Sequence, residues 1–103
     1  MSKINKQDVY DFLQRIPRGY VVTYGTIAEA FGDKKWARSI GNILHDNPDG
    51  EKYPCYKVVS ANGKLAVAYA FGGIERQKEL LESDGIEVTG YKVDLKKYHW
   101  NSK

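Results

Sequence analysis

The chain has 103 residues, of which 42% are hydrophobic and 28% are charged, and its formal net charge is +3. This length allows one domain with a modest core, and the apolar content excludes an intrinsically disordered chain. The longest wholly apolar run, residues 65–71, is too short to cross a bilayer, so we expect no association with membranes. The weak positive charge permits nucleic-acid binding without demonstrating it.

The first expected element is an amphipathic helix over residues 6–15. Its apolar side chains recur at the spacing of one helical face: Val9, Phe12, Leu13 and Ile16. Pro17 ends this helix because proline lacks a backbone N–H, and Gly19 follows as a turn residue. A short β-rich stretch, residues 20–22, comes next.

Residues 24–31 and 35–45 are expected to form two more helices, joined by a turn at Gly32. Thr23 is a typical N-cap for the first of them. The second would bury one stripe of side chains: Trp36, Ile40, Ile43 and Leu44. The pair predicts a helix-turn-helix unit, in which Arg38 lies in the first turn of the helix that would enter a DNA groove.

A β-hairpin is predicted after the turn at residues 47–50. Residues 53–59 are interpreted as a strand or an extended loop. The Asn-Gly pair within residues 61–64 favours a tight turn, after which residues 65–71 would return as a second strand.

A further helix is expected over residues 74–83, between the break at Gly72-Gly73 and a C-cap at Gly85. Alternating apolar and polar residues over 86–100 predict a tail that packs along the edge of the domain. A helix-turn-helix followed by a hairpin is a winged-helix arrangement. We therefore predict a mostly α fold with short β elements, in one winged helix-turn-helix-like domain over residues 1–103.

Cys55 is the one cysteine of the chain, so it cannot form an internal disulfide. Lys52 and Lys57 flank it, and a cation near a thiol favours the nucleophilic thiolate. The plainer interpretation is a small buried core residue. One thiol and a polar start to the sequence favour a reducing cytoplasm. No metal site is expected, because His45 and His99 lie far apart and no Cys/His pair has ligand spacing.

Six motifs follow one another along almost the whole chain. They are Ile16-Pro17-Arg18-Gly19, Val22-Thr23-Tyr24-Gly25, Ala37-Arg38-Ser39-Ile40-Gly41, Asn47-Pro48, Pro54-Cys55-Tyr56-Lys57-Val58-Val59, and Gly72-Gly73 with Lys78 and Leu80-Leu81. In this order they resemble the C-terminal domain of the O6-alkylguanine-DNA alkyltransferases. The resemblance implies a DNA repair protein that flips O6-alkylguanine out of duplex DNA and moves the alkyl group irreversibly onto its own cysteine, with no cofactor.

The resemblance also implies roles for residues of the cysteine motif. Cys55 would be the alkyl acceptor, in single-turnover chemistry. The backbone carbonyls of Cys55 and Val58 would accept hydrogen bonds from the guanine amino group. Asn47 would order the turn around the cysteine.

The DNA contacts implied by the resemblance come from three other motifs. Arg38 would enter the base stack from the minor groove, and Tyr24 would rotate the target nucleotide and contact the guanine ring. Gly72 and Gly73 would let the covering loop approach closely, with the backbone amide of Phe71 near O6. The plainer alternatives are a solvated charge for Arg38 and a packed aromatic for Tyr24.

Lysines near these motifs are candidate DNA phosphate contacts. Lys57 follows the cysteine, and Lys34 and Lys35 precede the motif that contains Arg38. Solvated lysine faces give the same pattern, so both interpretations stay open.

Two departures from the family pattern fall on the proton relay. The usual motif is Pro-Cys-His-Arg, and Tyr56 stands where the family has a histidine that takes the thiol proton through a water. A phenol with a reference pKa of about 10 is a poor acceptor at neutral pH, so Tyr56 is either a relay or a packing residue. Asp84 stands at the position of the family's glutamate and is shorter by one methylene; it is either the relay partner or a helix-end carboxylate.

Three functions follow from these observations. The first is alkyl transfer to Cys55, with the duplex containing O6-alkylguanine as partner. The second is that of the alkyltransferase-like proteins, which a chain of this length also resembles: lesion binding without transfer, followed by recruitment of nucleotide excision repair proteins. The third is a winged-helix module with no lesion preference. We expect a monomer in each case.

Overall fold

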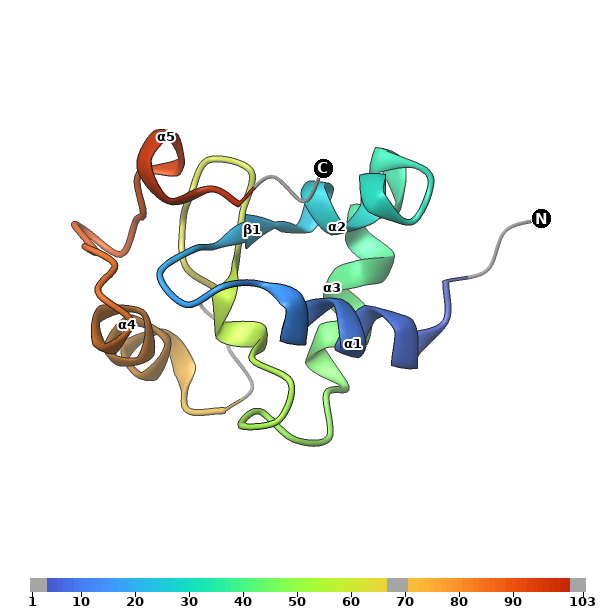
Figure 1. The fold of residues 1–103 in the computed structure, drawn as a ribbon, viewed down its shortest axis with the longest axis horizontal. Helices are drawn as coiled ribbons and strands as arrows, with labels where there is room; N and C mark the ends of the chain where they lie inside the picture. The colour runs from blue at the N-terminus through green and yellow to red at the C-terminus, as the bar shows by residue number, and fades with distance from the viewer. Residues whose placement is uncertain (1–3, 67–70, 101–103) are drawn as a thin grey trace.

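Helices make up most of the structure, as the sequence predicts. The computed structural model describes residues 4–66 and 71–100. Its elements in chain order are α1 (Lys6–Arg15), β1 (Val22–Thr23), α2 (Tyr24–Ala30), η1 (Lys34–Trp36), α3 (Ala37–His45), η2 (Cys55–Lys57), β2 (Val58–Val59), α4 (Gly73–Ser83) and α5 (Leu95–Tyr98) (Figure 1). The η elements are 3-10 turns.

Local capping explains where the first helices begin. The Asn5 side chain accepts a hydrogen bond from the backbone N–H of Asp8 at the start of α1. At the start of α2, Thr23 and Thr26 form a reciprocal capping box, in which Thr23 accepts from the backbone N–H of Thr26 at 3.0 Å. Thr23 is therefore the N-cap that its sequence position predicts.

The helix expected over residues 35–45 has two parts. Asp33 caps the 3-10 turn η1, since its side chain accepts from the backbone N–H of Lys35 at 2.9 Å. The α-helix α3 then starts at Ala37. Trp36 is consequently only half-buried, whereas Ile40 is fully buried in α3.

The turn of the expected hairpin forms, and the described strands have partners that the sequence did not indicate. The turn at residues 60–64 forms, with the Gly63 N–H donating to the Ser60 carbonyl at 2.9 Å. The 3-10 turn at Cys55–Lys57, however, leaves only β2 extended, and β2 pairs in parallel with β1. Lys64 pairs with Lys92 of the tail in an antiparallel bridge. Residues 67–70 of the expected return strand lie outside the described residues.

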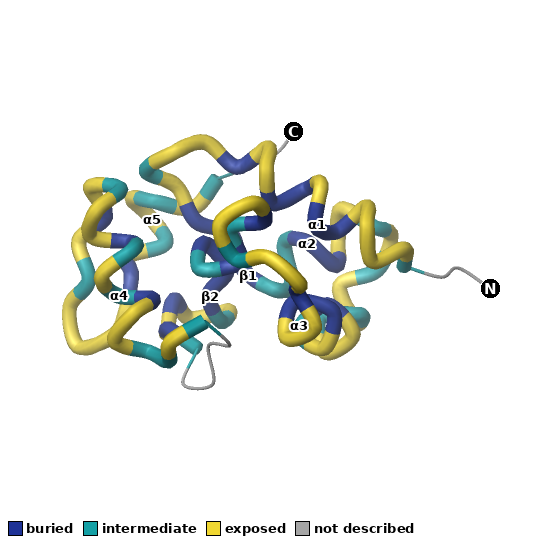
Figure 2. The backbone as a smooth tube through the Cα atoms, turned by 90° about the horizontal axis from the view of Figure 1, so that it is seen from below, coloured by how far each residue is buried: buried dark blue, intermediate teal, exposed yellow. Residues whose placement is uncertain are grey.

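The short sheet β1–β2 sits between two groups of helices. Figures 1 and 2 show α1, α2 and α3 on one side of it and α4 and α5 on the other. Val22 and Val58 are paired in register and are almost wholly buried. The buried segments converge on these strands in Figure 2. No helix within residues 4–66 and 71–100 is long and apolar enough to cross a membrane.

Gln77 joins α4 to the segment that carries the cysteine. Its side chain is fully buried. The Nε2 atom donates to the carbonyls of Tyr56 (2.9 Å) and Val58 (3.1 Å), and Oε1 accepts from the Ala66 N–H (2.8 Å). One side-chain amide thus satisfies three backbone groups, each of which would reduce the stability of the fold if it were buried without a hydrogen bond.

Replacement of Gln77 by leucine is expected to destabilise the fold by about 2–4 kcal/mol, because a side chain of similar size would leave these backbone groups without their partner. Chemical denaturation followed by circular dichroism measures the change. Glu82→Ala, at an exposed position of the same helix, is the control and should shift stability by less than about 0.5 kcal/mol. A loss below about 1 kcal/mol for Gln77→Leu would show that the three bonds do not hold α4 in place.

Candidate functional site

Cys55 opens a tight turn that is fixed from both sides. It lies directly after Pro54 at the start of η2 and is 7% exposed. Its N–H donates to the Tyr53 carbonyl at 2.7 Å, and its own carbonyl accepts from the Val58 N–H. The backbone of this turn therefore allows little movement of the thiol.

Asn47 holds the loop that leads into the cysteine turn. It is buried, and its Nδ2 donates to the Tyr53 carbonyl at 2.8 Å while its Oδ1 accepts from the Asp49 N–H at 3.0 Å. One side chain thereby links the start of the loop to the residue two positions before Cys55. The role in ordering the cysteine turn that the resemblance implies for Asn47 stays a prediction.

Tyr56 and Asp84 meet directly, although they are far apart in the sequence. The Tyr56 hydroxyl donates to Asp84 Oδ2 at 2.5 Å. Asp84 is the C-cap of α4, and its side chain is only 11% exposed. The phenol is long enough to reach the shorter carboxylate, so the two departures from the family pattern occur as a hydrogen-bonded pair.

Arg18 is the third member of this group; it lies in the first of the six motifs, but no role was expected for it. Its Nε lies 3.7 Å from Asp84 Oδ1, and its Nη2 donates to the Ser83 carbonyl at 2.7 Å. The arginine thus binds both the carboxylate and the end of α4. Because Arg18 is itself largely exposed, solvent weakens the ion pair.

Lys57 does not reach the surface where a phosphate would bind. It is only 7% exposed, and its Nζ donates to the Ile16 carbonyl at 2.9 Å. Burial lowers the pKa of Lys57, while the negative charge of Asp84 opposes that shift. The expected phosphate contact is therefore corrected in this structure: the aliphatic stem is packed, and the ammonium fastens the loop after α1.

Tyr24 lies near enough to Cys55 for the charge of a Cys55 thiolate to act on its phenol. It is the first residue of α2 and is partly buried, with its ring against α3 at Gly41. Burial raises the pKa of Tyr24, and the nearby charge of a Cys55 thiolate raises it further. The phenol is therefore neutral at physiological pH and can donate a hydrogen bond.

Arg38 is the remaining candidate for a DNA contact. It is exposed in the first turn of α3. Within the described residues its guanidinium takes part in no hydrogen bond or ion pair. An unrestrained, exposed arginine at the start of the second helix of a helix-turn-helix has the reach for a DNA groove.

The loop before α4 packs on the loop before Cys55. A Cβ at Gly50 would lie 2.8 Å from ring atoms of Phe71, so the Phe71 ring needs a glycine at this position. Gly72 and Gly73 have φ of +125° and +77°, a region that side chains with a Cβ rarely adopt. These two glycines turn the chain sharply from Phe71 into α4.

A hollow of about 500 Å³ lies beside the cysteine turn. Pro54 and Tyr56 line it from the turn, and Phe71, Arg76 and Leu80 line it from the α4 side. Glu51, Lys57 and Arg76 are the charged residues of the lining, and the aromatic and aliphatic groups beside them suit a planar or alkyl group. Across the part of the chain that the structure describes, no three His, Cys, Asp or Glu side chains are grouped to hold a metal.

Comparison with known proteins identifies the family of this chain. The family model of the 6-O-methylguanine DNA methyltransferase DNA-binding domain matches residues 5–86. A bifunctional methyltransferase/endonuclease of Picrophilus torridus is 44% identical over 91% of this chain, which spans 31% of that protein. A DNA base-flipping protein of Vibrio parahaemolyticus is 38% identical over 89% of this chain, which spans 91% of that protein.

Solved structures give the same result. Schizosaccharomyces pombe Atl1, in complex with damaged DNA containing O6-carboxymethylguanine, has a TM-score of 0.83 and 32% identity, with 92% of this chain and 93% of that chain covered. Mycobacterium tuberculosis OGT in complex with DNA has a TM-score of 0.71 and 36% identity, with 78% and 48% covered. The chain therefore belongs to the family of the 6-O-methylguanine DNA methyltransferase DNA-binding domain.

Proposed function

We propose that this protein repairs DNA by binding O6-alkylguanine in a duplex and transferring the alkyl group irreversibly to Cys55. The observation that carries the proposal is the fixed Pro54-Cys55-Tyr56 turn, whose tyrosine is hydrogen-bonded to Asp84. Family membership supports DNA lesion binding, and relatives named as methyltransferases support the transfer step. Simple groove reading would need neither the buried cysteine nor this pair.

Lesion binding begins with extrusion of the alkylated base. A base within the duplex shields O6 from in-line attack, and unstacking it costs a few kcal/mol. Arg38 fills the space in the stack and meets the negative groove, which offsets part of that cost. Tyr24 acts from the start of α2, where its neutral hydroxyl contacts the rotated nucleotide.

The extruded guanine then lies between the cysteine turn and the loop before α4. The backbone carbonyls of Cys55 and Val58 accept from its amino group. The Val58 carbonyl already accepts from Gln77, so one of its two lone pairs remains for the base. The backbone amide of Phe71 lies near O6, where Gly72 and Gly73 permit close approach.

The reaction exchanges one bond for another. The Cys55 sulfur forms a bond to the alkyl carbon, and the bond from that carbon to O6 breaks with its electron pair left on the guanine. The guanine takes up one proton while the thiol gives one up, so the overall charge is unchanged. Because the thioether is stable, each molecule reacts once.

The thiol proton leaves through Tyr56 and Asp84. The Tyr56 hydroxyl already donates to Asp84, so the phenol oxygen can accept a proton from the sulfur side as it passes its own to the carboxylate. Arg18 keeps the carboxylate oriented by binding its other oxygen. In this way the Tyr56 phenol, which is a poor proton acceptor by itself, relays the proton to the Asp84 carboxylate.

Lesion sensing without transfer is the second candidate. The substitution of Tyr56 for the family's histidine favours it, because a phenol is a poor proton acceptor at neutral pH. Relatives named as a DNA base-flipping protein and an alkyltransferase-like protein match this chain over about nine-tenths of their own length. In this role the protein would hold the flipped lesion and recruit nucleotide excision repair proteins.

Intact-protein mass spectrometry separates the two candidates. After the protein is mixed with a duplex that contains one O6-methylguanine, we expect a mass increase of one CH₂ that is absent from Cys55→Ala. The increase should reach one equivalent and stop. No mass change, together with lesion-selective retardation of the same duplex, would reject transfer and establish sensing.

Arg38→Ala is expected to weaken lesion binding about tenfold or more, because the guanidinium no longer offsets the cost of unstacking. Fluorescence anisotropy with lesion and normal duplexes measures the effect, and thermal unfolding should be unchanged. Arg15→Ala, at another exposed arginine, is the control and should have a much smaller effect. Equal losses for the two variants would mean that Arg38 contributes charge alone.

A further inference from the structure

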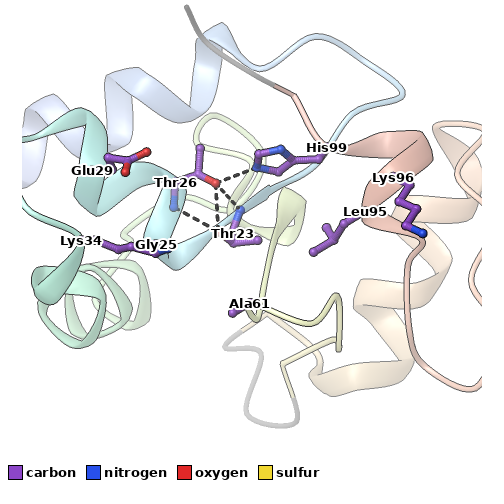
Figure 3. Close-up of a pocket in the computed structure, with 9 residues that line it drawn as sticks. All are labelled: Thr23, Gly25, Thr26, Glu29, Lys34, Ala61, Leu95, Lys96 and His99. Carbon is purple, nitrogen blue, oxygen red and sulfur yellow. Dashed lines mark hydrogen bonds between the residues drawn. The ribbon is translucent and has the colours of Figure 1, made fainter.

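A second hollow, of about 430 Å³, lies between α2 and the tail of the chain (Figure 3). Thr26 and Lys34 line it from the helix-turn-helix side, and Lys96 and His99 line it from the tail side. Figure 3 shows the two walls facing one another, with Ala61 of the turn after β2 nearby. None of these tail residues belongs to a motif that the family resemblance uses.

Hydrogen bonds fix the tail wall against α2. The His99 Nε2 and Thr26 Oγ1 atoms are 2.7 Å apart. On the backbone, the Val21 N–H donates to the Tyr98 carbonyl at 2.9 Å, and the Trp100 N–H donates to the Val21 carbonyl at 2.8 Å. The hollow is therefore built into the fold, and its tail wall does not depend on one side chain.

The charges around the hollow favour an anion. Lys34 and Lys96 are exposed, and within the described residues neither ammonium takes part in a hydrogen bond or ion pair. The stem of Lys34 lies along Gly25, since a Cβ there would be 3.6 Å from Lys34 Cε. Glu29 is the one carboxylate in the lining and opposes anion binding. The lysines outnumber it by two to one.

The position of the hollow points to DNA as the source of the anion. Gly25, in its lining, directly follows Tyr24, and Lys34 lies four residues before Arg38. The hollow is thus lined by the helix-turn-helix segment that also carries Tyr24 and Arg38, the two residues to which the proposed function gives contacts with the lesion strand. An anion-binding site beside a flipped nucleotide would meet the backbone of the DNA rather than its bases.

We propose that this hollow binds a backbone phosphate of the DNA that flanks the lesion, through Lys34 and Lys96. The proposal rests on the proposed function and extends it: the tail after α4 becomes part of the DNA-binding surface. The site contributes affinity and register, while discrimination between O6-alkylguanine and guanine stays with Tyr24 and Arg38.

The test is the salt dependence of binding by Lys34→Ala/Lys96→Ala, measured by anisotropy with lesion and normal duplexes between 50 and 200 mM NaCl. Each lost phosphate contact should reduce the slope of log K against log salt by about 0.9. We expect a reduction of about one for this variant, equal loss of affinity for both duplexes, and an unchanged ratio between them. Glu29→Gln should shift affinity in the opposite direction.

Lys92→Ala/Lys97→Ala removes the same charge outside the hollow and is the matched control. An equal fall in slope for this control would overturn the proposal, because the effect would then be one of overall charge. Duplexes that carry single neutral methylphosphonates give a second readout. We expect one position whose neutralisation weakens the wild type but not Lys34→Ala/Lys96→Ala, and the absence of any such position would also overturn the proposal.

Failure of this inference is distinguishable from failure of the proposed function. Wild-type protein that binds lesion and normal duplexes equally, and gains no mass, contradicts the proposed function. Lesion-selective binding with identical slopes for wild type and Lys34→Ala/Lys96→Ala contradicts the phosphate site alone. Thermal unfolding of each variant shows that the fold is retained in every comparison.

Discussion

The hydrogen bond between Tyr56 and Asp84 is the interaction on which the candidate site depends. It joins the cysteine turn to the end of α4, two segments that the chain brings together only by folding. Gln77 makes a second link between the same segments, through the carbonyls of Tyr56 and Val58. The cysteine turn is therefore held against α4 by its side chain and by its backbone.

The loop after α1 completes this arrangement. Lys57 binds the Ile16 carbonyl, and Arg18 binds Asp84 and the Ser83 carbonyl. Two cations thus lie around the Tyr56–Asp84 pair, one buried and one exposed. The buried ammonium carries a desolvation cost that its hydrogen bond and the Asp84 charge reduce. We propose that this environment lets a tyrosine and an aspartate do what a histidine and a glutamate do in the alkyltransferases that this chain resembles.

Much of the fold could be predicted from local pattern. The helical spacing of Val9, Phe12 and Leu13 and the cap at Thr23 predict helices that the structure confirms. The long-range strand pairings could not be predicted, because they depend on partners far away in the sequence: β2 pairs with β1, and Lys64 pairs with Lys92 of the tail. An Asn-Gly turn predicts that the chain reverses its direction, but it does not determine which segment pairs with the strand before the turn.

Residues of the candidate site could be predicted where they belong to motifs. They could not be predicted where they depend on contacts between distant parts of the chain. The positions of Cys55, Asn47 and Tyr24 follow from the motifs, whereas the role of Arg18 depends on a contact with Asp84 that no sequence spacing indicates. The burial of Gln77 could have been inferred from its spacing alone, because it lies four residues before the buried Leu81 and so on the same face of the helix. Lys57 was assigned a contact that the structure does not support. A lysine near a DNA-binding motif suggested a phosphate contact, and nothing in the local sequence indicated that this lysine is buried.

The most direct test of this account is the single-turnover rate of methyl transfer against pH for the wild type and Asp84→Asn. Asparagine keeps the size of the side chain and an acceptor for Tyr56 but cannot take the proton. If Asp84 is the base behind Tyr56, Asp84→Asn should react about 10²- to 10⁴-fold more slowly. Its rate should also depend on pH differently from that of the wild type, because an amide cannot take up the proton. Equal rates and equal pH profiles for the two proteins would contradict the account.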